Sequence, residues 1–521
     1  MVSPSRRVMT KLDSVRSVRR SSRWSQQLQE FSGRRLHAGG RPVGLARAAQ
    51  SLAFVMIALL TVQRNDLAII QIALGSTRIS ELLAVGVVSL VLFNACVTSG
   101  RTRRIPRGIT VAIVLFFGVM LLSSFLSAQI HSGANVRAIV RRPDREVPFL
   151  KSYTTLLSWG LGVVTFYAVV VTINTPASLR RALKWWVIGG AACSAIAVYS
   201  APATVFGWPL ADTIGVSARA AAVIGAEDIL PRVYGLTGEP RHLVTFLVSL
   251  LPLLVLAGAS RVTVMGPRAQ SLCLGLCALA FLLTLSRSTL VYGAAMVALV
   301  LFFGSTGKRN MTIPAPARTI LVTCLVLVPT VAVVEFALAL FRLPDLWTIF
   351  RYQLDSMASS DDNLSNWFQT IGWQVAWAAF WDHPLLGVGI GNLSFYVDQY
   401  IGVVQQPTWL PDSQYVVVTP VNNVYLDLLS ETGLLGVTAF VVLVGTISRS
   451  GWKASRVAGP SGRAVVSGLL CGMLMLLVAF VFFSAFNFAY VWASLAFLVV
   501  AARLVLNEPD CFECWAAGRS A

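Results

Sequence analysis

The chain has 521 residues, of which 56% are hydrophobic and only 12% are charged, and its mean hydropathy is +0.70. This composition excludes an ordinary soluble domain, because it comes from apolar runs of about 17–25 residues, the length that a helix needs to cross a bilayer. It also excludes a transmembrane barrel, whose strands show only weak alternating segments of about ten residues. The net charge of +19 would suit a nucleic-acid-binding protein, so the positions of the basic residues must decide that question.

Residues 1–45 are predicted to form a basic cytoplasmic arm that is mostly disordered. Eleven arginine and lysine residues fall within the first 47 positions, against two acidic ones, Asp13 and Glu30. Such a segment before a first span is typical of an arm that lies near anionic lipid headgroups. Because no nucleic-acid-binding fold and no interleaved aromatic residues accompany it, anionic membrane lipids are the expected partner and nucleic acid is not.

Twelve transmembrane helices are predicted, nine within residues 46–341 and three within residues 432–505. Basic residues in alternate loops place both chain ends in the cytoplasm, which predicts an all-α, multi-pass protein of the plasma (inner) membrane. The loop at 129–151 dissents, since it would carry five basic residues outside. The predicted spans centre on 46–62, 79–97, 109–128, 153–173, 184–201, 242–259, 269–285, 288–304, 317–341, 432–448, 464–483 and 487–505.

Two loops dominate the predicted outer face, at 202–241 and at 342–431, and the second is long enough to form a small extracytoplasmic domain. It holds six tryptophans mixed with aspartates, which suits either an aromatic belt at the membrane interface or stacking on sugar rings. Residues 366–381 show helical periodicity and predict an amphipathic helix on the membrane. The stretch 382-DHPLLGVGIGN-392 then predicts a tight turn, because it combines a proline with three glycines.

The C-terminal segment 506–521 is predicted to be a short cytoplasmic tail. It carries a C-x-x-C pair at Cys511 and Cys514. Because no second pair accompanies it, incidental or palmitoylated cysteines are favoured over a metal site.

Charged residues at the ends of predicted spans are the first candidates for chemistry. Arg287 lies in 281-FLLTLSRSTLVYG-293 between two apolar runs, where an arginine either snorkels to the interface or binds an anion in a cavity. Arg232, Glu239, Arg241 and His242 gather just before the sixth span, and Glu239-Pro240 also favours a helix start. Converging arginines would provide rigid forks for a diphosphate.

A second candidate group lies in 421-VNNVYLDLLSETGLLGVTAFVVLVGTIS-448, which starts polar and continues as a span. Asn423, Asp427 and Glu431 fall on one helical face, while Asn422 lies beside it. One asparagine can cap the helix, but a cap does not explain two aligned carboxylates. With four histidines in the chain and no D-x-D on the outer loops, a metal-independent site without a cofactor is preferred.

These motifs, in this order, resemble the O-antigen ligase and polymerase family, which are bacterial membrane glycosyltransferases of the GT-C type. The resemblance rests on "R-x-x-G-x-x-x-E-P", "L-S-R-S", "D-H-P-L-L-G-V-G-I-G-N" and "N-N-x-Y-L-x-L-L-x-E-x-G-L-L-G", and it extends over roughly 45–505. It implies glycan transfer from an undecaprenyl-diphosphate carrier to an acceptor glycan or glycolipid on the outer face. It also implies that Arg232, Arg287 and Arg241 hold the diphosphate.

The resemblance further implies substrate contacts for Asn422, Asn423, Tyr425 and His242. The base candidates are Glu239, Asp427 and Glu431. The sequence departs from the ligases at Asn422, where they carry a histidine, and at the "E-P" of 239–240, which is more similar to exopolysaccharide polymerases. Both departures favour a polymerase.

Two other functions remain open from sequence. A transporter or flippase of a lipid-linked glycan would also need many spans and inward arginines, although it should show matched halves, which the sequence lacks. A non-catalytic scaffold would use the same polar residues as caps and anchors, and would lose stability rather than activity on removal of Arg287.

Overall fold

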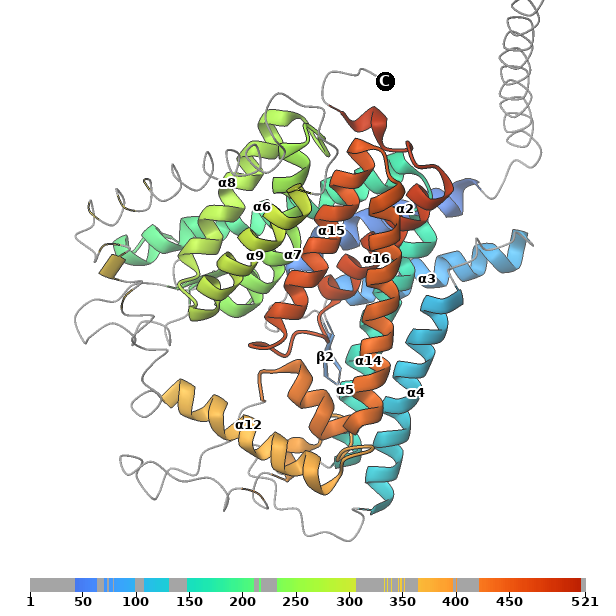
Figure 1. Cartoon of the computed structure of the whole chain (residues 1–521), viewed down its shortest axis with the longest axis vertical. Helices are drawn as coiled ribbons and strands as arrows, with labels where there is room; N and C mark the ends of the chain where they lie inside the picture. Colours follow the sequence, from blue (N-terminus) through green and yellow to red (C-terminus); the bar gives the residue numbers. More distant parts are fainter. Residues whose placement is uncertain are drawn as a thin grey trace, which may run out of the picture.

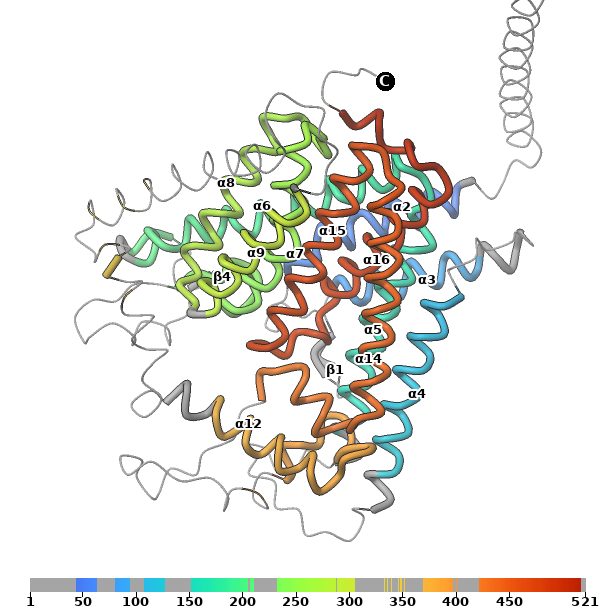
Figure 2. Tube along the Cα trace, in the orientation of Figure 1, coloured from blue at the N-terminus to red at the C-terminus, as the bar shows by residue number. Residues whose placement is uncertain are grey.

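The computed structural model describes most of the predicted helical part of the chain, which Figure 2 draws in colour. The predicted arm of residues 1–45, the loop 129–151, the span 317–341 and the loop 202–241 lie mostly outside the described residues. The described ranges are 43–62, 70–72, 75–77, 79–98, 107–130, 148–209, 215–216, 232–305, 364–396 and 421–516, with isolated positions at 332–351 and at 400.

The described residues form a mostly helical protein (Figure 1). Its first half contains α2 (Val43–Ala58), η2 (Leu59–Thr61), α3 (Ile79–Thr98), α4 (Arg107–Ile130), α5 (Pro148–Thr172), α6 (Pro176–Phe206), α7 (Pro240–Ala259), α8 (Pro267–Leu283) and α9 (Arg287–Ser305). Its second half contains α12 (Leu364–Asp382), η5 (Leu393–Phe395), α14 (Val424–Val457), α15 (Pro460–Ala479), α16 (Ala489–Asn507) and η7 (Glu513–Trp515). Two antiparallel hairpins complete it: β1 (Ile70–Ile72) pairs with β2 (Gly75–Thr77), and β3 (Gly215–Val216) pairs with β4 (Val233–Gly235).

Eight of the described helices are long and apolar enough to cross a membrane: α2, α4, α5, α6, α7, α14, α15 and α16. Three more, α3, α8 and α9, hold shorter apolar stretches. The prediction of an all-α polytopic membrane protein is therefore confirmed as a class. The count of twelve stays a prediction, because the span 317–341 lies outside the described residues.

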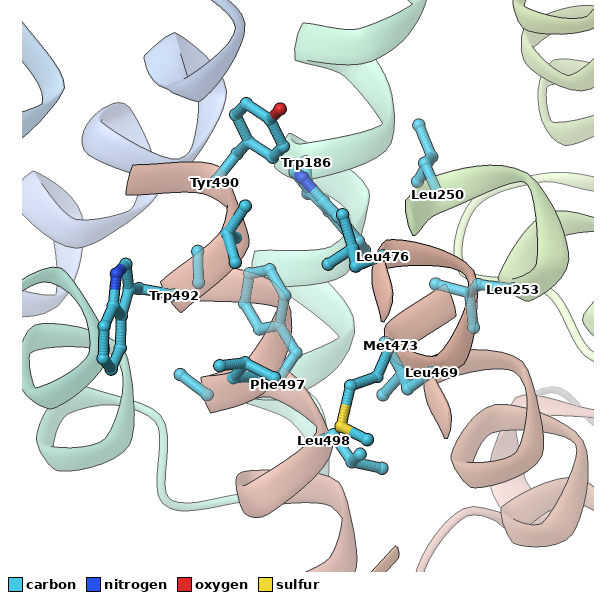
Figure 3. Packing of buried hydrophobic residues seen from close by; sticks show 14 of the residues in the cluster. Trp186, Leu250, Leu253, Leu469, Met473, Leu476, Tyr490, Trp492, Phe497 and Leu498 are labelled. Carbon is cyan, nitrogen blue, oxygen red and sulfur yellow. The ribbon is translucent and has the colours of Figure 1, made fainter. Parts of the chain in front are cut away.

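The core of the molecule is built around α15, which packs along α7 on one side and against α16 on the other (Figure 3). α7 and α15 approach closely because small residues line their contact: a Cβ on Gly472 would lie 2.3 Å from the Ser249 carbonyl oxygen. Large side chains fill the adjoining space, with Trp186, Trp492 and Phe497 fully buried. By contrast, α4 and α5 are far more exposed along their length.

The C-terminal segment folds back onto the beginning of α15 and the loop before α8. The Glu513 carboxylate accepts hydrogen bonds from the N–H (2.9 Å) and the hydroxyl (3.1 Å) of Ser461, in the first turn of α15, where the helix dipole favours a negative charge. The Trp515 carbonyl accepts from the N–H of Thr263 at 3.1 Å, and the Trp515 side chain is buried. This segment therefore ties two parts of the bundle together.

α12 confirms the predicted helix over 366–381 and lies across one end of the bundle, at an angle to α14 (Figure 1). Its apolar face holds Ile371, Val375 and Ala379, all buried. This face packs against residues of the 388–396 segment and against Val421, so it is covered by protein.

Candidate active site

A break in α14 organises the first part of the site. Gly433 adopts φ 63° and ψ −163°, a backbone conformation that is essentially restricted to glycine. A broken helix leaves N–H groups after the break without helical partners. The turn after α12 provides them: the N–H of Leu434 donates to the Pro384 carbonyl at 2.9 Å, and the N–H of Leu435 donates to the Leu385 carbonyl at 3.2 Å.

The same turn satisfies the carbonyl groups before the break. The N–H of Val388 donates to the Ser430 carbonyl and the N–H of Gly389 to the Glu431 carbonyl, each at 2.9 Å. We call this assembly of residues 384–389 and 430–435 the α14 junction. A Gly-rich turn can bind phosphate through its amides, but these two amides bind α14 instead.

Close backbone contact explains why the predicted turn needs its glycines. A Cβ on Gly387 would lie 2.3 Å from the Glu431 carbonyl carbon, and a Cβ on Gly433 would lie 2.3 Å from the Leu385 carbonyl carbon. Real Cβ atoms do not approach this closely, so neither position accepts a side chain without a shift of the backbone. The two segments thus fix each other.

Neighbouring helices hold the turn from the outside. Ser123 on α4 places its hydroxyl 2.6 Å from the Leu386 carbonyl oxygen, and Ser152 on α5 donates to the Ile390 carbonyl at 2.8 Å. Both serines are buried. The α14 junction is therefore anchored to the bundle as well as to α14.

The start of α14 carries the two aligned carboxylates. Asn423 caps the helix, since its side-chain oxygen accepts from the N–H groups of Tyr425 (3.0 Å) and Leu426 (3.1 Å). Asp427 and Glu431 follow at one-turn spacing on the same helix. The prediction that an asparagine caps this helix is confirmed for Asn423.

The two carboxylates have different partners. The Glu431 carboxylate accepts from the N–H of Leu393 at 3.5 Å and interacts with Lys151 on α5, so it belongs to the α14 junction. The Asp427 carboxylate instead accepts a short hydrogen bond from the hydroxyl of Ser484. Asp427 therefore faces another part of the molecule.

That other part is the connection between α15 and α16, residues 480-FVFFSAFNF-488, which we call the aromatic loop. It begins beside the start of α14, where the Val424 N–H donates to the Phe480 carbonyl at 2.9 Å. Ser484, at its centre, is the partner of Asp427. Sequence reasoning missed this loop; the available signal was a cluster of five phenylalanines interrupted by a serine and an asparagine between two spans.

The segment before α7 also contacts the aromatic loop. α7 begins at Pro240 with Glu239 at the N-cap position, as predicted. The Glu239 carboxylate lies 3.6 Å from the Arg241 guanidinium and 3.8 Å from Nε2 of His242. Arg241 also lies over the ring of Phe483, 5.8 Å from its centroid.

His242 is held in place more tightly than its neighbours. Its Nδ1 lies 2.9 Å from the Thr237 carbonyl oxygen. Its ring packs against Phe483 and Phe488, which also contact each other, with centroid distances of 4.8 and 4.7 Å from the imidazole. The side chain of His242 is 17% exposed, whereas that of Glu239 is 52% exposed, so Glu239 is the more accessible of the two.

The hairpin between α8 and α9 joins this group through Arg232. The Arg232 guanidinium donates to the Thr284 carbonyl at 3.3 Å. Thr284 lies three residues before Arg287 in the hairpin. Leu285 adopts φ 44°, which is uncommon for a side chain of this size. Arg287 begins α9, and its side chain lies outside what the structure describes.

Two segments thus meet at the aromatic loop: the segment 232–242 and the polar start of α14. The hairpin 284–288 contacts the first of these segments at Arg232. Of the predicted site residues, Arg241, His242 and Asp427 contact the aromatic loop, and Arg232 contacts the hairpin. Glu431 belongs to the α14 junction.

Three residues of the 422–425 motif were predicted to contact the substrate. In the structure two of them form hydrogen bonds within the protein, and the third has an uncommon main-chain conformation. The Tyr425 hydroxyl donates to the Leu477 carbonyl at 2.7 Å, inside the bundle. Asn423 uses its side-chain oxygen in the helix cap. Asn422 precedes the cap with φ 54°, a left-handed conformation that asparagine tolerates better than most residues.

The tryptophans of α12 serve more than one role. Trp373 donates from its indole N–H to the Val421 carbonyl at 3.1 Å and so anchors α12 to the start of α14. Trp377 and Trp381 are 49% and 63% exposed and meet edge to face, 5.8 Å between centroids. Their exposed rings remain compatible with an interfacial belt and with sugar stacking.

Comparison with known families identifies part of the chain. Residues 272–441 match the family model described as "O-Antigen ligase". The match confirms the resemblance to the O-antigen ligase and polymerase family. Within the O-antigen ligase match lie most of α8, together with α9, α12, the α14 junction and both carboxylates of α14. Among curated proteins, no sequence matches this chain.

Two parts of the candidate site lie outside the matched stretch. The segment 232–242 precedes the match, and the aromatic loop follows it. In the part of the chain that the structure describes, no three His, Cys, Asp or Glu side chains gather as metal ligands.

Proposed function

We propose that this O-antigen ligase-type membrane protein transfers a glycan from an undecaprenyl-diphosphate carrier to a hydroxyl of an acceptor sugar on the outer face of the membrane. The observation that carries the proposal is the meeting of segment 232–242 and the start of α14 at the aromatic loop, with the hairpin 284–288 held against segment 232–242 by Arg232. It brings groups for a leaving diphosphate and for an acceptor hydroxyl to one place.

The arginines supply the electrostatic part of this reaction. A lipid diphosphate leaves with its charge, so the enzyme mainly has to stabilise that charge and align the reactants. Arg232, Arg241 and Arg287 are the groups that we assign to the diphosphate, in place of a metal ion. The contact of Arg232 with the hairpin at Thr284 supports this assignment, because it brings the main chain of residue 287 close to Arg232.

The start of α14 is assigned to the acceptor. Asn422 and Asp427 lie at the end of the helix that faces the aromatic loop, and Asn422 offers an amide to sugar hydroxyls. An amide does not take up a proton near neutral pH, so Asn422 orients the acceptor and another group accepts its proton. Asn422 and the Glu239-Pro240 pair favour a polymerase, which elongates a carrier-linked repeat.

The test uses purified protein in nanodiscs with undecaprenyl-diphosphate oligosaccharides. Wild type should produce long glycans and release the carrier diphosphate, with or without EDTA. Arg287→Ala should lower the transfer rate by about 100-fold or more, the usual loss for one charge-stabilising group. Arg268→Ala is the matched control, since Arg268 is an exposed arginine at the other end of α8.

The outcomes separate the possible functions. Transfer of a single glycan to a distinct acceptor would identify a ligase. Carrier movement across the bilayer without transfer would identify a transporter and would overturn the proposal. Equal losses of folded protein and of activity in Arg287→Ala would favour a scaffold role for this arginine.

A further inference from the structure

The exposed side of α12 changes from polar to apolar along the helix. Thr370 and Gln374 are exposed in its first part, whereas Trp377 and Trp381 are exposed near its end. Leu385, in the turn that follows, is 63% exposed. We call Trp377, Trp381 and Leu385 the α12 apolar patch. Large apolar side chains that gather at a surface mark contact with a membrane or with another molecule.

This patch is separate from the apolar face of α12 that packs on protein. The residues along that face are buried against the 388–396 segment and Val421. Trp377 and Trp381 lie on the other side of the helix, about half a helical turn away from that face. The core beneath α12 therefore does not account for the exposed tryptophan rings.

Contacts with α4 place the turn after α12 at the end of a membrane span. The hydroxyl of Ser123 lies 2.6 Å from the Leu386 carbonyl oxygen. The apolar span of α4 covers Arg107–Leu126, so Ser123 belongs to its last turn. Leu122 and Phe125 flank Ser123 and are exposed, as expected of side chains that face lipid. The turn therefore lies at the depth where the hydrocarbon region ends.

The contacts with α14 give the same depth. The apolar run of α14 starts at Leu434, directly after the break at Gly433. The N–H of Leu435 donates to the Leu385 carbonyl at 3.2 Å, and the side chains of both residues are exposed. The exposed apolar surface of the span therefore continues from Leu435 onto Leu385, at one end of the α12 apolar patch.

We propose that the α12 apolar patch lies in the boundary between the acyl chains and the headgroups of the membrane. Tryptophan prefers this boundary, because its ring is apolar while its indole N–H can still reach water or a headgroup. The polar side chains at the start of α12 then lie on the aqueous side, so the helix approaches the lipid through its end. The membrane thereby supports the turn that closes the α14 junction. This inference does not depend on the proposed function.

Two other occupants of the patch are less well supported. A sugar that stacked on the rings would need partners for its hydroxyls. The carboxylate next to the rings, that of Asp382, already accepts a hydrogen bond from the Tyr400 hydroxyl at 2.7 Å. A second copy of the chain could cover the rings, but it would also have to displace lipid from Leu435 of the span.

The test uses the full-length protein with fluorotryptophan in nanodiscs, so that each of the 14 tryptophans gives a fluorine NMR signal. Trp377→Phe, Trp381→Phe and Trp373→Phe assign three of these signals by their loss. A lipid with a nitroxide on its acyl chain near the headgroup then broadens the signals of rings that lie in the boundary. The signals of Trp377 and Trp381 should be lost, and should return when ascorbate reduces the nitroxide.

Trp373 is the matched control, because it lies one turn before Trp377 on the same helix and packs on the protein side. Its indole N–H donates to the Val421 carbonyl at 3.1 Å, and its signal should persist. Broadening of Trp377 and Trp381 by the lipid probe supports the proposal whether or not a water-soluble gadolinium chelate also reaches them. Signals that persist like that of Trp373 would overturn it. The chelate then identifies the alternative: rings that it broadens are open to a glycan, and rings that neither probe reaches are covered by a second copy.

Discussion

The α14 junction and the aromatic loop lie at the two ends of one short helical segment, yet they are built in different ways. The α14 junction is held by main-chain hydrogen bonds across Gly433 and by contacts too close for a side chain. The aromatic loop shares one main-chain hydrogen bond with α14, from Val424 to Phe480, and is otherwise held mainly by side chains: Ser484 with Asp427, and two phenylalanines with His242.

This difference predicts which substitutions should lower stability and which should slow the reaction. Main-chain contacts have few ways to adjust, so a substitution at the α14 junction should destabilise the whole fold. Side chains around the aromatic loop can be exchanged for others of similar size, so substitutions there should mainly change the transfer rate. Asp427 and Glu431 lie one turn apart and belong to opposite sides of this division.

The largest effect is expected for Gly433→Ala. The new Cβ would lie 2.3 Å from the Leu385 carbonyl carbon, in a backbone conformation that alanine rarely adopts. We expect a cost on the order of 3 kcal/mol or more from strain and overpacking, enough to deplete folded protein. The measurement is the yield and thermal unfolding of detergent-solubilised protein.

Gly445→Ala is the control for that substitution. It lies in the same helix, and a Cβ there meets nothing within 4 Å. Its unfolding temperature should match or exceed that of wild type, because alanine favours a helix over glycine. A stable Gly433→Ala protein would show that the α14 junction can shift. The α14 junction would then be as adaptable as the aromatic loop, contrary to this prediction.

The next effect compares Asp427→Asn with Glu431→Gln. Both replacements keep the shape of the side chain and remove its charge. Asp427→Asn should leave the unfolding temperature unchanged and slow transfer by about tenfold or more, since an amide oxygen accepts the hydrogen bond from Ser484 less strongly than a carboxylate does and positions the start of α14 less well. Glu431→Gln should instead lower stability by about 1 kcal/mol, because an amide oxygen accepts the hydrogen bond from the Leu393 N–H less strongly than a carboxylate does.

The rates are to be normalised to folded protein in each case. If Glu431→Gln slowed transfer more than Asp427→Asn did, without loss of stability, the two carboxylates would have to exchange roles. The start of α14 would then be one continuous catalytic face, as its sequence periodicity alone suggests.

Sequence patterns predicted the local features of this molecule because they depend on a few neighbouring residues. The start of α7 at Glu239-Pro240, the cap at Asn423 and the Gly-rich turn after α12 all follow from local rules of dihedral angle and hydrogen bonding. The spans followed from length and apolarity, although the count of twelve stays a prediction.

The long-range features could not be predicted in the same way. The pairing of Ser484 with Asp427 joins residues 57 positions apart, and nothing in either local sequence specifies the other. The helix prediction ran through Gly433 without a break, because a single glycine inside an apolar run is usually tolerated. The helix breaks at Gly433 because residues 384–389 pack against it, which the local sequence does not specify.

The smallest effect, and the finest test of the aromatic loop, is Ser484→Ala. It removes the hydrogen bond to Asp427 and keeps both the carboxylate and the phenylalanines. A hydrogen bond to a charged group contributes about 1.5 kcal/mol or more, so transfer should slow by about tenfold if the bond positions Asp427 for the reaction. The loss should appear in kcat at unchanged carrier affinity. Ser484→Thr, which keeps a hydroxyl, should recover most of it.

Ser448→Ala separates this role from a general effect of losing a serine. Ser448 also lies on α14 and is half-buried, but its hydroxyl donates only to the Val444 carbonyl of its own helix. It should transfer at the wild-type rate. If Ser484→Ala behaved like this control, the contact between the aromatic loop and Asp427 would be a packing contact, and the site would rest on the segment 232–242 and the hairpin alone.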